Sequence, residues 1–90
     1  MNSNISQQEL QTFASAAVEV QRISDDYQLK FAASHTPQER DKIQREATDK
    51  MTKAVTDKGL TVDQYNDVAR TAQSDSHVAD QINEYAKKML

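Results

Sequence analysis

A stripe of mostly apolar residues, spaced alternately by three and four positions, runs through residues 10–31. Side chains at these intervals lie on one side of an α-helix, as in the seam of a coiled coil or a helix bundle. The members of the stripe are Leu10, Phe13, Ala17, Val20, Ser24, Tyr27 and Phe31. No Gly or Pro interrupts the segment, so a helix about 40 Å long is predicted. One helix cannot bury such a stripe alone, and the rest of the chain must cover it.

Local signals mark where helices begin and end. In a capping box, Ser or Thr followed three positions later by Glu or Gln satisfies free backbone N–H groups at a helix start. Such boxes occur at Ser6–Glu9, Thr36–Glu39 and Thr61–Gln64. Pro37 suits a first helical turn, Gly59 suits a left-handed helix end, and Asp75 can cap a last helix. The predicted helices span residues 7–34, 37–58, 62–73 and 76–89.

The scarcity of turn residues sets the fold class. The 90 residues include one Gly and one Pro, whereas turn-rich β-folds need many more of both. We therefore expect an all-α fold with a single helical domain over residues 1–90. Short connections make neighbouring helices antiparallel. The expected architecture is a long antiparallel helical hairpin plus two shorter helices, a three- to four-helix bundle.

The second predicted helix offers a sparse apolar face. Its apolar positions are Ile43, Ala47, Met51, Ala54 and Val55. A face this sparse is expected to leave part of the first helix uncovered, which would favour contact with another protein or with a second copy of the chain.

We find no residue set that indicates catalysis, a cofactor or a metal. His35 and His77 lie in different inter-helix regions, and their separation does not match a zinc-ligand motif. Asp25 and Asp26 are adjacent on one helix, so their carboxylates do not converge as acid–base chemistry requires. One Gly cannot form a Gly-rich phosphate loop, and the absence of Cys excludes thiolate chemistry. We expect no enzyme activity and no cofactor.

Charge and hydropathy argue against nucleic acid and membrane-spanning roles. The formal net charge is −3, and residues 37–58 carry six bases against five acids, so no basic stripe is present. No apolar run approaches the ~18 residues of a membrane span. The first residues, Met1–Asn4, are polar and form no signal peptide, so an exported form would have lost its leader.

Four aromatic residues are the candidates for an interaction surface. They are Tyr27, Phe31, Tyr65 and Tyr85. Aromatic residues at helical spacing pack first into a core, but some of these would form an exposed patch for a partner chain if the core leaves them uncovered.

Two runs of residues resemble a known bacterial family. They are the pattern of Ile5–Ala16, with Val20, Gln21, Ile23 and Tyr27 after it, and the segment Gly59–Ala69, with Ala72–Asp75 after it. Together they resemble short bacterial proteins grouped as the domain of unknown function numbered 4168, over Ile5 to about Ile82. The resemblance implies export to the periplasm or beyond the cell and carries no assigned activity. Ser76 stands where the family usually has Pro.

The sequence supports three functional hypotheses. The leading one is a non-catalytic helical binding or structural domain of an exported bacterial protein, with a protein partner or a second copy. The first alternative is a small-ligand carrier or an enzyme with an inter-helix pocket near Tyr27, Tyr65 or Tyr85. The second is a cytoplasmic regulatory domain that binds a protein or nucleic acid.

Overall fold

The computed structural model of the chain describes residues 5–89, and over this range it contains four α-helices and no strand. The helices are α1 (Gln7–Ala33), α2 (Pro37–Asp57), α3 (Val62–Ser74) and α4 (Ser76–Met89). The predicted all-α class is confirmed. Of the polar lead-in expected at residues 1–5, residues 1–4 lie outside the described residues, and Ile5 packs against the core.

The helix starts follow their capping residues. Thr36 and Thr61 each form a complete capping box, in which the side chain at the third helical position also accepts from the backbone of the Thr. At α1 only half of the expected box is present: Ser6 Oγ accepts from Glu9 N at 3.0 Å. The other half is dispensable because Ser6 is exposed and water can satisfy its N–H. Asp75 caps α4 by accepting from two backbone N–H groups in its first turn.

The ends of α1, α2 and α3 differ from the predicted ends by one residue, whereas α4 ends at Met89 as predicted. α1 ends at Ala33 rather than Ser34, because Ser34 has extended backbone and returns its N–H to Phe31 O at 3.2 Å. α2 ends at Asp57 rather than Lys58, and α3 extends one residue further, to Ser74.

Gly59 has the left-handed backbone expected of it, with a φ of 95°. Leu60 N donates to Val55 O at 3.3 Å and Gly59 N donates to Thr56 O at 3.0 Å, the bond pair of a Schellman ending. This ending turns the chain so that Leu60 is buried in the same hydrophobic cluster as Val55.

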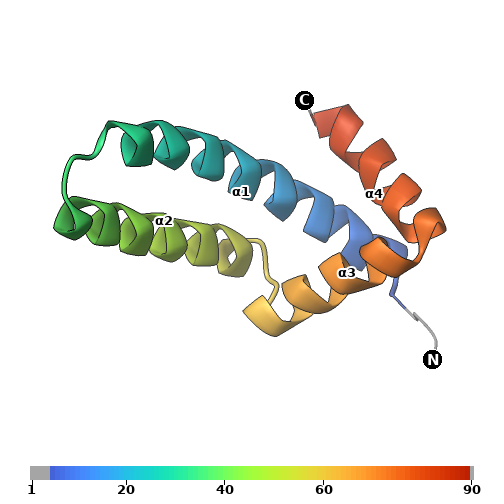
Figure 1. Ribbon diagram of the computed structural model, residues 1–90. Coiled ribbons are helices and arrows are strands. Elements are labelled where there is room, and N and C mark those ends of the chain that lie inside the picture. Colours follow the sequence, from blue (N-terminus) through green and yellow to red (C-terminus); the bar gives the residue numbers. More distant parts are fainter. Residues whose placement is uncertain (1–4, 90) are drawn as a thin grey trace.

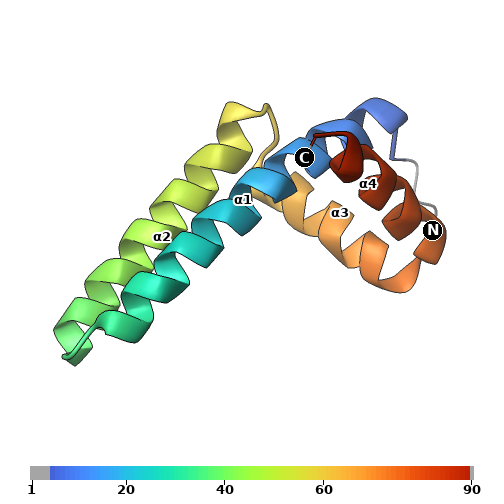
Figure 2. The same ribbon diagram turned by 90° about the horizontal axis from the view of Figure 1, so that it is seen from above.

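α1 and α2 form a long antiparallel hairpin, and α3 and α4 gather at the end where α1 begins (Figures 1 and 2). α4 packs against α1 and α3, while α3 also meets α2. The molecule is elongated, with extents of 45 × 25 × 24 Å. We call residues 21–53, the part of the hairpin beyond α3 and α4, the arm, and the remainder of the described chain the head.

The main core lies in the head, where helices converge on the first half of α1. Its buried members are Leu10, Phe13, Ala14, Ala16, Val55, Leu60, Val68, Val78 and Ile82. Because α3 and α4 pack at that end of α1, no other helix of residues 5–89 covers the arm, where α1 and α2 pack against each other (Figures 1 and 2).

Candidate interaction surface

The structure separates the four candidate aromatic residues into two pairs. Tyr27 and Phe31 lie on the arm, one helical turn apart on α1, whereas Tyr65 is on α3 and Tyr85 on α4. Tyr65 and Tyr85 are partly buried against the core of the head. The four residues therefore do not form one continuous patch.

The side chain of Tyr65 is partly buried and packs against the core of the head. Its ring stacks on that of Phe13, with centroids 4.6 Å apart. Burial raises the pKa of Tyr65 above its ordinary value of 10.0, because an apolar environment disfavours the phenolate. The neutral phenol is thus favoured in the folded protein, and one face of this ring is already occupied by Phe13.

Tyr27 and Phe31 differ in exposure. Tyr27 is buried between α1 and α2, and the Nζ of Lys30 lies 4.6 Å from the centroid of its ring. Phe31 retains 44% of its accessible surface. An exposed phenyl ring beside a buried tyrosine marks the arm as the place where the apolar stripe of α1 reaches the surface.

An open groove of about 330 Å³ runs along the arm between α1 and α2. Its apolar lining consists of Tyr27, Phe31 and Ala32 from α1 and of Ile43, Ala47 and Met51 from α2. Its polar edges are Ser24, Gln28 and Gln44. We call this feature the arm groove. None of its lining residues is charged, although 28% of the residues in the chain are Asp, Glu, Lys or Arg.

The other side of the same helix pair is charged. Two shallow hollows there are lined largely by ionisable residues, including Glu19, Lys50 and Lys53 in one and Lys30, Glu39 and Glu46 in the other. Successive helical residues are about 100° apart, so Gln28 and Lys30 project from opposite sides of α1, and Gln44 and Glu46 from well-separated sides of α2. The arm therefore has one charged side and one side whose groove is lined by uncharged residues.

The uncharged side continues the face of α1 that is covered in the head. Phe31 lies about five helical turns beyond Phe13, so both project in one direction, and the same holds for Ala32 and Ala14. In the head this face is covered, and Phe13 and Ala14 are 6% and 0% exposed. In the arm the equivalent face has no covering helix within the described chain.

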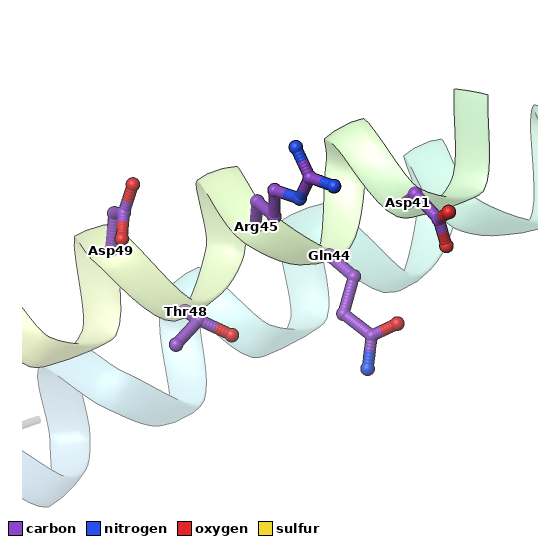
Figure 3. Close-up of a pocket in the computed structure, with 5 residues that line it drawn as sticks. All are labelled: Asp41, Gln44, Arg45, Thr48 and Asp49. Carbon is purple, nitrogen blue, oxygen red and sulfur yellow. The ribbon is translucent and has the colours of Figure 1, made fainter. Parts of the chain in front are cut away.

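A separate polar hollow lies on the outside of α2 and is lined by residues of that helix alone (Figure 3). Arg45 and Asp49 point to one side of the ribbon, and Gln44 and Thr48 point to the other (Figure 3). The side chains diverge from one helix, so they do not enclose a ligand from several directions. Gln44 is shared with the arm groove and separates its uncharged lining from the charged residues Asp41 and Arg45 of this hollow.

Within residues 5–89 no three His, Asp or Glu side chains gather as metal ligands, and no polar or charged residue is buried. His35 lies in the α1–α2 connection and His77 in the first turn of α4. None of the helices in the described range combines the length and the apolar character that crossing a membrane requires.

The sequence identified Ile43, Ala47 and Met51 as an apolar face but missed the polar edges of the groove. Gln28 and Gln44 are ordinary exposed residues when each helix is considered alone. The one signal in the sequence was the lack of charge on one side of both helices, and it becomes readable only when their relative orientation is known.

Fold and surface define a class: a small helical protein whose hairpin arm presents an uncharged groove. Residues 6–82 match the family described as "Domain of unknown function (DUF4168)", so the chain belongs to this family and the resemblance found in the sequence is confirmed. Comparisons with curated proteins and with solved structures gave no match.

Proposed function

We propose that this chain is a non-catalytic binding or structural domain of an exported bacterial protein and that it acts through contact with another protein chain. The observation that carries the proposal is the arm groove, an apolar strip with uncharged edges on a helix pair that nothing in the described chain covers. Protein interfaces are depleted of charge at their centre and enriched in aromatic residues and Met, which matches Tyr27, Phe31 and Met51.

Capture from bacterial envelope extract tests the binding role. Tagged wild-type protein is compared with Gln28→Lys, which places a charge at the groove edge, and with Glu46→Gln, which makes the same charge change on the other side of the arm. We expect the wild type and Glu46→Gln to retain one set of partners and Gln28→Lys to lose it. Light scattering over a concentration series is run in parallel. A monomer that retains nothing would contradict the proposal.

The proposed export rests on the resemblance to exported family members and is tested separately. Fractionation of cells that express the full native gene should place the protein with periplasmic or secreted markers. Recovery with a cytoplasmic marker would instead support the alternative of a cytoplasmic regulatory domain.

A small-ligand carrier is the second candidate, and the same groove favours it. Its volume of about 330 Å³ is near the lower end of small-molecule sites, and its lining is mainly apolar with a few polar groups at the edges. Titration with an apolar fluorescent probe tests this candidate: a carrier would bind the probe at one saturable site, and Ser24→Phe, which adds a bulky side chain at a partly exposed lining position, would abolish that binding. Weak binding that this substitution leaves unchanged would remove the candidate.

A further inference from the structure

The two sides of the arm differ in the kind of protein surface that each can pack against. In a contact between two identical copies related by a two-fold axis, each residue on the axis faces its own copy, so any charge there meets a like charge. The side that contains Lys30 and Glu46 would suffer such pairings, whereas the side that contains Gln28 and Gln44 would not. An oppositely charged partner, in turn, would find no charge in the arm groove to pair with.

The arm also has the shape of half a bundle. Two antiparallel helices that share an open apolar seam bury it fully when two more helices cover it, as in a four-helix bundle. In the head, α3 and α4 cover the equivalent face of α1. A second arm would provide two helices of matching length and identical apolar chemistry to the face that is left open.

The position of the head selects the orientation of such a pair. The head helices cover Phe13 and Ala14, and these residues project from the same side of α1 as Phe31 and Ala32, which line the groove. Two copies packed groove to groove in parallel would bring their heads into collision. An antiparallel arrangement instead places each head beyond the tip of the other arm.

Residue sizes along the groove agree with the antiparallel arrangement. Because α1 and α2 run in opposite directions, the bulky Phe31 and Ile43 lie at the end near the connecting loop, and the small Ser24 lies at the opposite end with Met51. An antiparallel pair sets Phe31 of one copy against Ser24 of the other, so along α1 a large side chain meets a small one, while along α2 Ile43 meets the flexible Met51.

We propose that the arm groove is the interface of a two-fold homodimer in which two arms pack antiparallel, α1 on α1 and α2 on α2, and form a four-helix bundle. This inference rests on the proposed binding function and specifies its partner as a second copy of the chain. The axis crosses the middle of the groove, so Gln28 of each copy faces Gln28 of the other.

Single cysteines test the arrangement, and the chain contains no Cys of its own. We expect oxidised Gln28→Cys to form a covalent dimer at low micromolar concentration and Glu46→Cys, at the same level on the charged side, to remain monomeric on a non-reducing gel. Equal cross-linking of both variants would overturn the inference. Stronger self-cross-linking of Phe31→Cys than of Gln28→Cys would indicate a parallel pair and would overturn the antiparallel arrangement.

Sedimentation equilibrium gives an independent measure. Gln28→Lys should weaken dimerisation about tenfold or more, because a like charge then faces itself across the axis, and Glu46→Gln should leave the dissociation constant unchanged. Both positions are exposed, so circular dichroism should show unchanged helix content. A wild type that is monomeric at every concentration overturns the second-copy inference. The proposed binding function would then be judged by the capture experiment alone. If the wild type retains a different envelope protein and Gln28→Lys does not, the groove is the binding site for that protein.

Discussion

The ring of Tyr65 on α3 lies on the ring of Phe13 on α1, with centroids 4.6 Å apart and planes inclined by 29°. This stacked pair joins the third helix to the long first helix across the core of the head. Phe13 is buried at the same time, so the pair combines area burial with a specific aromatic geometry. The packing of the head therefore depends on a contact between residues far apart in the sequence.

A double-mutant cycle measures this contact. Phe13→Leu and Tyr65→Leu should each lower the free energy of unfolding by about 1–2 kcal/mol. The double variant should lose about 0.5–1.5 kcal/mol less than the sum, because each single change already removes the aromatic pairing. Urea denaturation followed by circular dichroism provides the values. Phe13→Leu combined with Tyr27→Leu, on the arm, serves as the additive control, and strict additivity for Phe13 and Tyr65 would contradict the stacking energy.

The raised pKa of Tyr65 predicts a loss of stability at alkaline pH. Its phenol holds the proton more tightly in the folded state than in the unfolded chain, whose pKa is near the ordinary value of 10.0. The contribution is complete below that value and is lost as pH rises through the folded-state pKa. The urea midpoint of the wild type should fall more steeply than that of Tyr65→Phe once the pH rises above the ordinary value of 10.0. Parallel curves for the two proteins would exclude the effect.

The helix starts and the left-handed turn after α2 were predictable because their causes are local. Thr36 and Thr61 bond to backbone groups within the next four residues, and Gly59 supplies its own left-handed backbone. None of these features depends on how the helices pack. The ends of α1, α2 and α3 shifted by one residue, since the last turn of a helix frays or tightens according to the conformation of the connection after it.

The spacing of the apolar residues on α1 did not predict which part of that helix the other helices cover. Phe13 and Phe31 occupy equivalent positions about five turns apart on α1, yet one is 6% exposed and the other 44%. The difference arises because α3 and α4 both pack at the head, a choice set by long-range contacts. For the same reason Tyr65 and Tyr85 lie in the head while Tyr27 and Phe31 lie on the arm.

Two leucines on different faces of α1 test the contrast between a buried and an exposed position of this helix. Leu10 is 2% exposed in the core of the head, whereas Leu29 on the arm is 75% exposed. Leu10→Ala should lower the free energy of unfolding by about 2–5 kcal/mol, because it removes buried methyl groups and leaves a cavity. Leu29→Ala should change it by less than about 0.5 kcal/mol. Thermal denaturation of both variants checks the contrast, and similar losses would show that the arm is covered in solution at Leu29.

The end of α2 offers a test of backbone conformation without a packing change. A Cβ placed on Gly59 would meet nothing within 4 Å, so the cost of Gly59→Ala comes from its φ of 95° alone. An L-residue with left-handed backbone costs about 1–2 kcal/mol, and we expect Gly59→Ala to lower the free energy of unfolding by that amount. Gly59→Asn should cost less, because Asn tolerates this region better. Lys58→Ala, at a neighbouring residue with a φ of −85°, is the matched control and should be nearly neutral. Equal stability of Gly59→Ala and Lys58→Ala would mean that the Schellman ending, and the turn that buries Leu60, is not maintained in solution.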